Sequence, residues 1–159
     1  MKCFGPVVIF RLDALRFAVA LDAVERFVLA VEITDLPKAP ESVHGVIDVA
    51  GRVLPVFNLR KQLGLRERGV EIDDLFLIAR SAGREVALVV DESLGVTELS
   101  EFDTSERDEI LPGLEHFRGV ARLDDGLVLI HDLERFLSID EARALDEAMS
   151  RDAMHGGQN

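Results

Sequence analysis

Histidine and cysteine are the residues of this 159-residue chain that most readily carry catalysis or bind a metal ion. The four histidines are His44, His116, His131 and His155. The strongest combination is His131 followed by Asp132, because a carboxylate can orient an imidazole. Adjacent strand residues point to opposite faces, however, and the zinc-binding spacing His-x-x-x-His does not occur. Cys3 stands alone, with no nearby base to activate its thiol. We therefore expect no catalytic residue, metal site or cofactor.

Carboxylates are the second group that could carry chemistry. Acidic residues outnumber basic ones by 30 to 18, which gives a formal net charge of −12. Pairs such as Asp73-Asp74 are typical of turns, and the acidic stretch at residues 98–125 fits a solvated loop better than a cation site. Neither Gly-x-x-x-x-Gly-Lys nor Gly-x-Gly-x-x-Gly is present. Because this much negative charge repels a phosphate backbone, we expect no nucleic-acid partner.

The elements that must position any site are short strands. Apolar runs of strand length, rich in Val, Ile, Leu and Phe, occur at residues 7–10, 17–21, 27–31, 75–79, 86–90 and 127–130. Helical signals are confined to residues 59–63, which end before Gly64, and to the C-terminal segment that begins with the capping box Ser138-Ile139-Asp140-Glu141. The pattern predicts an all-β fold with short helices and a C-terminal helix.

The chain is expected to form a single domain over residues 1–149, followed by a disordered tail at 150–159. Charged residues interrupt the apolar N-terminal stretch within a few positions, so we expect no membrane insertion. A single cysteine fits a reducing compartment, which predicts a cytoplasmic protein.

An internal repeat organises these strands. When the chain is aligned with itself at one constant offset, Gly45-Val46 matches Gly119-Val120 and Asn58-Leu59 matches Asp132-Leu133, with no gap between positions 45 and 63. At a slightly smaller offset, residues 17–22 align with residues 86–91. We interpret the match as a duplication, which predicts two similar small barrels that bury a common apolar seam.

Residues 36–60 carry the most specific motif. A lead-in with two prolines is followed by Gly45-Val46-Ile47, Asp48-Val49-Ala50-Gly51, Leu54-Pro55-Val56 and Asn58-Leu59-Arg60. This order resembles the signature of the CheW family of chemotaxis coupling proteins: Gly-hydrophobic-hydrophobic, Asn-Leu-Arg-Gly, hydrophobic-Pro-hydrophobic and Asp-Leu-Arg. The resemblance continues through residues 88–91, 119–120 and 128–133, and it covers residues 7–149.

The resemblance implies a fold of two intertwined five-stranded SH3-like barrels packed side by side. It also implies a non-catalytic adaptor that couples chemoreceptors to a CheA-type histidine kinase in bacterial chemotaxis. The cytoplasmic tip of methyl-accepting chemoreceptors would lie as a helical hairpin in the groove between the lobes. The regulatory CheW-like domain of the kinase would dock barrel end to barrel end, and the protein would be recruited to membrane receptor arrays.

Two alternatives stay open. The chain could be a diverged CheW-like scaffold of a non-motility chemosensory pathway, or a small-ligand sensor or enzyme that uses the cavity between the lobes. The first is suggested by departures from the family pattern. Ala50 stands where the family has arginine, and Asn58 replaces the aspartate of Asp-Leu-Arg. The family arginine faces a glutamate that aligns with Glu25, so Glu25 would lack its partner unless Arg26 or Arg52 reaches it.

The predicted receptor-binding set follows from this resemblance. We expect Val46 and Ile47 to line the groove and Gly45 to allow close approach of a partner backbone. The alternative is that Val46 and Ile47 belong to the core. Arg52 and Arg60 are expected as polar contacts at the rim, and Glu25 and Ala50 complete the set.

Overall fold

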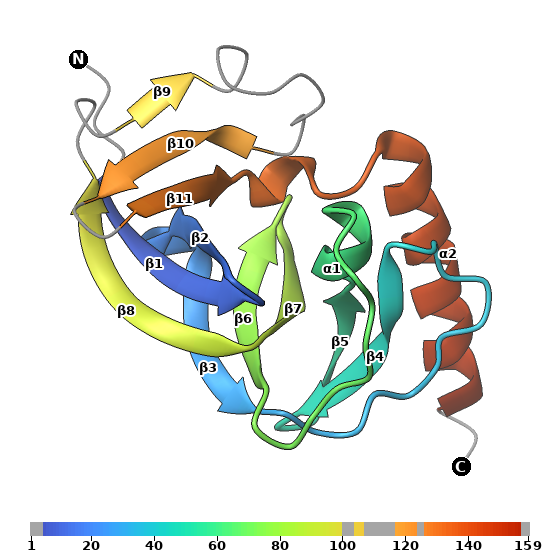
Figure 1. The fold of residues 1–159 in the computed structure, drawn as a ribbon. Helices are drawn as coiled ribbons and strands as arrows, with labels where there is room; N and C mark the ends of the chain where they lie inside the picture. The colour runs from blue at the N-terminus through green and yellow to red at the C-terminus, as the bar shows by residue number, and fades with distance from the viewer. Residues whose placement is uncertain (1–4, 100–103, 107–116, 124–125, 157–159) are drawn as a thin grey trace.

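The computed structural model describes residues 5–99, 104–106, 117–123 and 126–156, which form two β-lobes side by side (Figure 1). Sheet A has six strands in the order β8-β1-β2-β11-β10-β9. Its strands are β1 (Gly5–Leu12), β2 (Leu15–Ala20), β8 (Glu92–Leu99), β9 (Thr104–Glu106), β10 (Phe117–Leu123) and β11 (Gly126–His131).

Sheet B has five strands in the order β3-β6-β7-β5-β4. They are β3 (Val24–Leu29), β4 (Val43–Val49), β5 (Arg52–Phe57), β6 (Leu75–Ser81) and β7 (Arg84–Val90). The helical elements are the 3-10 turns η1 (Leu21–Ala23) and η4 (Leu133–Arg135) and the helices α1 (Leu59–Gln62) and α2 (Ile139–Gly156).

The two lobes exchange strands. β3 follows β2 through η1, yet it pairs with β6 of sheet B; β8 follows β7, yet it pairs with β1 of sheet A. Each lobe therefore contains strands from both halves of the chain. The prediction of two intertwined barrels is confirmed, with the difference that sheet A gains the short additional strand β9.

The predicted repeat is visible in the strand register. In sheet A, β11 lies parallel to β2 and pairs Ile130 with Ala18. In sheet B, β5 lies parallel to β7 and pairs Val56 with Ala87. The two offsets of the repeat match Val56 to Ile130 and Ala18 to Ala87, so one arrangement occurs twice.

The repeat extends to the turn after each hairpin. The side chain of Asn58 accepts a hydrogen bond from the N–H of Lys61, and the side chain of Asp132 accepts one from the N–H of Glu134, each at 3.1 Å. Asparagine and aspartate are both strong helix caps, so replacing the family aspartate by Asn58 keeps this function. Gly64 follows α1 with a φ of 71°, the conformation predicted for a glycine that ends a helix.

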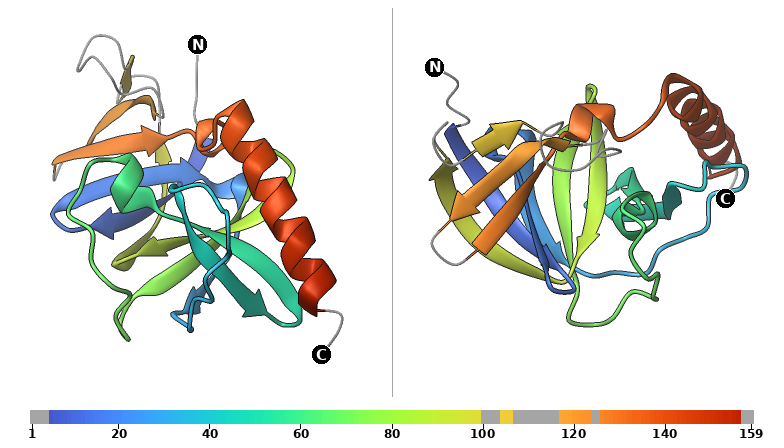
Figure 2. Two further views of the ribbon diagram at one scale, coloured as in Figure 1. Left: turned by 90° about the vertical axis from the view of Figure 1, so that its right-hand side faces the viewer. Right: turned by 45° about the horizontal axis from the view of Figure 1, so that its top comes forward.

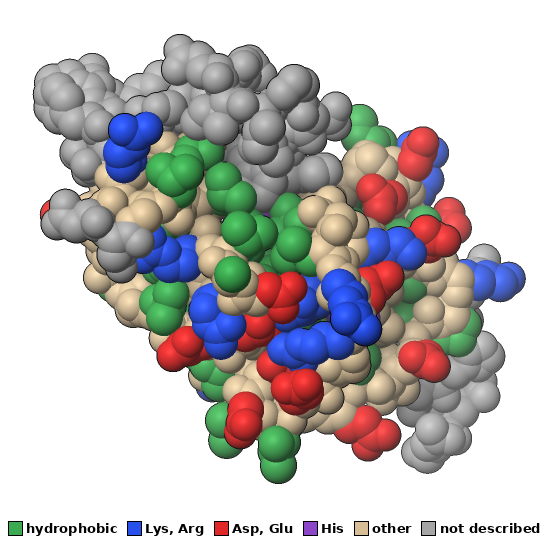
Figure 3. Space-filling model, in the orientation of Figure 1, with side chains coloured by type: hydrophobic (Ala, Val, Ile, Leu, Met, Phe, Trp, Pro, Cys, Tyr) green, Lys and Arg blue, Asp and Glu red, His purple; other side chains and the backbone are tan. Residues whose placement is uncertain are grey.

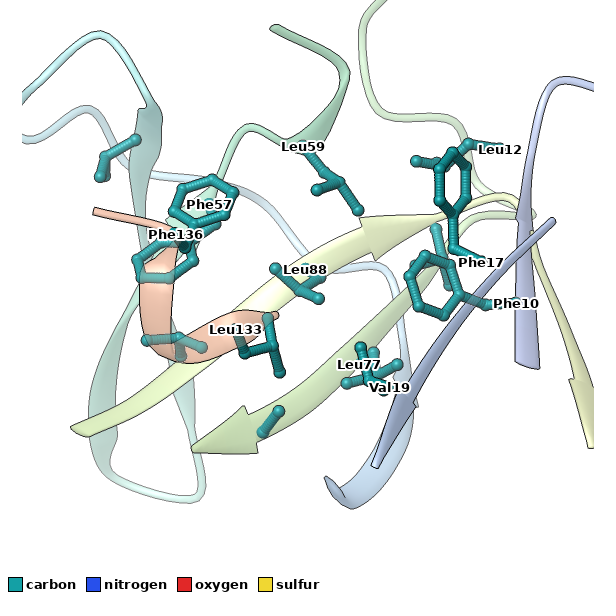
Figure 4. Close-up of a cluster of buried hydrophobic side chains, with 14 of the residues drawn as sticks. Phe10, Leu12, Phe17, Val19, Phe57, Leu59, Leu77, Leu88, Leu133 and Phe136 are labelled. Carbon is teal, nitrogen blue, oxygen red and sulfur yellow. The ribbon is translucent and has the colours of Figure 1, made fainter. Parts of the chain in front are cut away.

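Three apolar cores hold the described parts of the lobes together. One fills each barrel, and the largest lies between the sheets, where Phe10, Phe17 and Val19 of sheet A face Leu77 and Leu88 of sheet B (Figure 4). At the other end of this seam, the rings of Phe57 and Phe136 stack with centroids 4.0 Å apart. Such pairs contribute about 0.5 to 1.5 kcal/mol beyond the area they bury.

Helix α2 begins with the predicted capping box. The N–H of Glu141 donates to Ser138 Oγ at 3.1 Å, and the N–H of Ser138 donates to Glu141 Oε1 at 3.2 Å. The helix lies along the outside of the β4–β5 hairpin (Figure 2) and buries Leu145 and Ala148 against the seam. It continues to Gly156, so the domain boundary predicted at residue 149 falls inside α2, and residues 157–159 lie outside the described part. Within the described ranges, no helix is long and apolar enough to cross a membrane.

Candidate functional site

A row of alternating charges crosses one end of sheet B. Arg80 Nε of β6 lies 3.4 Å from Glu25 Oε1 of β3, and Arg52 Nη1 of β5 lies 2.6 Å from both carboxylate oxygens of Glu85 on β7. Arg80 and Glu85 are directly opposed in the β6–β7 pair, so the four residues follow one another from β3 to β5. We call them the charged row.

The row lies at the mouth of the barrel that sheet B forms, which we call barrel B. Arg80, Glu85 and Arg52 each stand two positions beyond a residue of the barrel core, namely Ile78, Ala87 and Leu54. Because side chains alternate along a strand, these charges share the face of that core and close it from solvent. The turn Ala50-Gly51 between β4 and β5 is at the same end, and both residues have positive φ, as in a type I′ turn.

Glu25 has a different partner from those expected. Neither Arg26 nor Arg52 pairs with it; the partner is Arg80, which the sequence reading missed. A β-bulge in the pairing of β3 with β6 lies between Val24 and Arg26, and this places Glu25 beside the adjacent strand. Because β3 and β6 are far apart in the sequence, no local sequence pattern predicts that Glu25 contacts Arg80.

Arg80 also borders a pocket of about 180 Å³ between the lobes. The pocket is lined by β1, β2, η1, β6, β11 and η4, and we call it the inter-lobe pocket. Its residues are Val7, Val19, Ala20, Asp22, Ala23, Arg80, Ile130, His131, Asp132, Leu133 and Glu134. Small-molecule sites usually measure about 300 to 1,000 Å³, so this pocket is too small for a typical metabolite.

The inter-lobe pocket has an apolar floor and an acidic rim. Val7, Val19 and Ile130 of sheet A lie beneath it and are at most 2% exposed, so the accessible part of the floor belongs to the half-buried Ala20 and Ala23. The carboxylates of Asp22, Asp132 and Glu134 stand around them, and two of the three are fixed. Asp132 caps η4, and Glu134 accepts a hydrogen bond from the N–H of Ala82 at 3.0 Å.

Arg60, predicted at the rim of the groove, is instead the centre of a buried ion cluster. The cluster consists of Arg60, Arg68, Asp13, Asp74 and Asp91; its centre is buried, while the side chains of Asp13 and Arg68 at its edge are partly exposed. Arg60 is 7% exposed and donates to Asp13 at 2.9 Å and to Asp91 at 2.8 Å. In Figure 3, acidic and basic side chains interleave over the middle of the molecule. The expectation for Arg60 was wrong, because its side chain turns inward to join α1 to the β1–β2 turn and to the end of β7.

The cluster shifts the protonation equilibria of its carboxylates. Burial disfavours the charged form of Asp91, but the N–H of Asp13 and the Arg60 guanidinium outweigh it and lower the pKa of Asp91. The pKa of Asp74 is likewise lowered, since its hydrogen bonds to Arg68 and to the N–H of Glu71 outweigh burial. Asp74, expected only as a turn residue, therefore has a second role in the cluster.

Three further predicted receptor contacts are internal. Val46 is 5% exposed in the seam between the lobes, and Ile47 is 2% exposed inside barrel B, so both belong to the core and neither lines an open groove. Gly45 does allow close backbone approach, but the approaching backbone is Thr34 of the same chain. A Cβ on Gly45 would lie 2.3 Å from the Thr34 carbonyl oxygen. Of the predicted set, Glu25, Ala50 and Arg52 remain exposed and lie together.

A second surface lies at the opposite end of barrel B. Four apolar side chains are exposed there: Leu29, Val31, Val70 and Ile72. We call them the apolar end patch; Ile72 is 89% and Leu29 is 72% exposed. Hydrophobic side chains also gather at the lower edge of the molecule in Figure 3, below the end of β3. Exposed apolar groups clustered in this way mark interaction surfaces.

The histidines form no centre in the described part of the chain. His131 is 3% exposed and its Nε2 lies 3.0 Å from Gln62 Oε1. Burial lowers the pKa of His44, with Glu67 opposing the shift. Among the described side chains, no group of three or more His, Cys, Asp or Glu is placed to hold a metal ion. Cys3, His116 and most of the acidic stretch lie outside the described residues.

Comparison with known proteins accounts for this architecture. The family model described as the CheW-like domain matches residues 6–141, which include strands of both lobes. The chain belongs to the CheW-like family. It is 28% identical to the chemotaxis protein CheW of Thermotoga maritima over 131 residues, which cover 82% of this chain and 86% of the relative. It is 26% identical to the chemotaxis protein CheW of Bacillus subtilis over 157 residues, covering 97% and 95%.

The fold is similar to a solved CheW structure. The scaffolding protein TtCheW from Thermoanaerobacter tengcongensis matches with a TM-score of 0.77 and 25% identity, covering 86% of this chain and 94% of that one. CheW family proteins are non-catalytic scaffolds, and this chain is a chemotaxis coupling adaptor. The family model ends at residue 141, so most of α2 lies beyond the matched segment.

Proposed function

We propose that the protein couples the cytoplasmic tip of methyl-accepting chemoreceptors to the regulatory CheW-like domain of a CheA-type histidine kinase, at membrane receptor arrays. The main support is the CheW-like match across both lobes. A coupling protein needs two separate exposed surfaces on one rigid body. The charged row with the inter-lobe pocket is one such surface, and the apolar end patch lies at the other end of barrel B.

We assign the receptor contact to the charged row and the inter-lobe pocket. Glu25, Ala50 and Arg52 are exposed beside Arg80, and a helical hairpin could lie across them and place a side chain in the pocket. We assign the kinase contact to the apolar end patch. A barrel end with exposed apolar groups provides the apolar centre that a stable interface requires.

Reconstitution tests the proposal. Membranes that hold a chemoreceptor from the same organism should sediment the purified protein together with the kinase, and kinase autophosphorylation should then depend on the protein. Ile72→Glu should abolish kinase binding and spare receptor binding. Ile139→Glu on α2 is the matched control, because Ile139 is 81% exposed. If the membranes sediment neither the purified protein nor the kinase, the coupling function is ruled out.

A further inference from the structure

We infer that the inter-lobe pocket receives one basic side chain, Lys or Arg, from the helical hairpin of the chemoreceptor. The inference rests on the proposed function and adds the chemistry by which the pocket recognises its partner. It starts from the division of the pocket into an apolar floor and a rim of carboxylates.

Lysine and arginine side chains match that division. Their methylene stems pack against apolar surface while the charged head stays near water. A stem lying on Ala20 and Ala23, the half-buried apolar residues of the lining, would bring the head to the rim, where it meets carboxylates. The pocket's 180 Å³ suits a single long side chain and is small for a bulkier ligand.

The charges around the rim leave a negative balance. Asp22, Asp132 and Glu134 line the pocket, and Glu25 lies beside it through its ion pair with Arg80. The basic groups nearby are already engaged: Arg80 with Glu25, and Arg135 with Asp132 at 3.6 Å. Asp22 makes no ion pair among the described residues. Four carboxylates against two guanidinium groups favour a cation from a partner and disfavour an acidic side chain.

A double variant with uncharged side chains at the rim tests the pocket. Asp22→Asn with Glu134→Gln removes two negative charges, and the glutamine oxygen can still accept the hydrogen bond from Ala82. Asp132 is left in place because it caps η4. The matched control is Asp140→Asn with Glu147→Gln, the same two substitutions at exposed positions of α2.

The readout is affinity for a soluble fragment that holds the receptor hairpin tip. The pocket variant should bind about tenfold more weakly than the control at low salt, with a shallower salt dependence, while kinase binding and the melting temperature stay unchanged. Equal affinity of the two variants would overturn the inference and leave the coupling function standing.

A second measurement decides the chemistry without any receptor. Titration of the isotope-labelled protein with N-acetyl-arginine amide should give saturable amide shifts at Asp22, Ala23 and Glu134, absent with N-acetyl-norleucine amide and in the pocket variant. If receptor and kinase fail to bind but these shifts appear, the proposed function is wrong and the pocket chemistry holds. If the shifts are missing, the inference is wrong.

Discussion

Glu25 of β3 and Arg80 of β6 form an ion pair across neighbouring strands, with 3.4 Å between Oε1 and Nε. The pair is exposed, since 57% of the Arg80 side chain and 29% of the Glu25 side chain remain accessible. It joins the charged row to the inter-lobe pocket, because Arg80 belongs to both. The sequence suggested that Glu25 lacked a partner; the fold supplies one from a strand that no local motif connects to it.

The Glu25–Arg80 pair should show a small, salt-dependent coupling. In a double-mutant cycle with Glu25→Gln and Arg80→Met, we expect a coupling of about 0.5 kcal/mol in the free energy of unfolding, typical of exposed pairs. Urea denaturation measures it, and about 1 M NaCl should remove most of it by screening. A coupling indistinguishable from zero at low salt would contradict the pairing.

Arg60→Met should be far more destabilising. It leaves the carboxylate of Asp91, whose side chain is 10% exposed, without its central guanidinium, and breaking a buried ion pair typically costs about 3 to 5 kcal/mol. The lost contact with Asp13, whose side chain is 48% exposed, adds little. Because Arg68 still contacts Asp91, we expect about 3 kcal/mol by urea denaturation. Arg52→Met, which breaks an exposed pair, is the control and should cost under about 1 kcal/mol. Similar losses for the two variants would mean that Arg60 is not the centre of the cluster.

The sequence predicted what local rules determine. Apolar runs located β1, β2, β3, β6, β7 and β11, and the Ser138 to Glu141 spacing located the start of α2. The constant offset of the internal repeat aligned Asn58 with Asp132, and in the structure the two residues are equivalent caps. Periodicity and capping are visible in a short window, and the repeat is visible once the chain is aligned with itself.

What the sequence could not supply was the direction of individual side chains. Arg60 and Arg52 are both arginines near the same motif, yet one is buried among carboxylates and the other lies at a barrel mouth. Val46 and Ile47 are adjacent in the motif and therefore face opposite sides of β4, but the motif does not show that a core covers each side. These outcomes depend on strand exchange between the lobes, which brings Asp13, Asp91 and Arg60 together from distant segments.

Val46→Glu should unfold the protein rather than selectively abolish receptor binding. Val46 is 5% exposed in the seam, so the substitution places an unpaired carboxylate in an apolar core. We expect a loss of at least about 3 kcal/mol, measured by thermal and urea denaturation. Val53→Glu is the matched control, because Val53 on β5 is 46% exposed and should tolerate the charge. A folded Val46→Glu variant with normal stability would place Val46 at an accessible surface and revive its role as a receptor contact.

The buried ion cluster predicts loss of stability in acid. The pKa values of Asp74 and Asp91 are lower in the folded protein than the ordinary 3.8, so near that pH the unfolded chain binds more protons and stability rises with pH. Their contribution is complete above about pH 5 and is lost as pH falls through the folded-state values. His44, whose pKa is lowered from 6.5, adds a loss that begins below about pH 6.5. Urea denaturation between pH 7 and pH 2 measures the profile. Asp74→Asn should lower stability at pH 7 and flatten the curve below pH 4, and His44→Gln should flatten the part that begins just below pH 6.5. An Asp74→Asn variant with an unchanged slope below pH 4 would show that the cluster does not control acid unfolding.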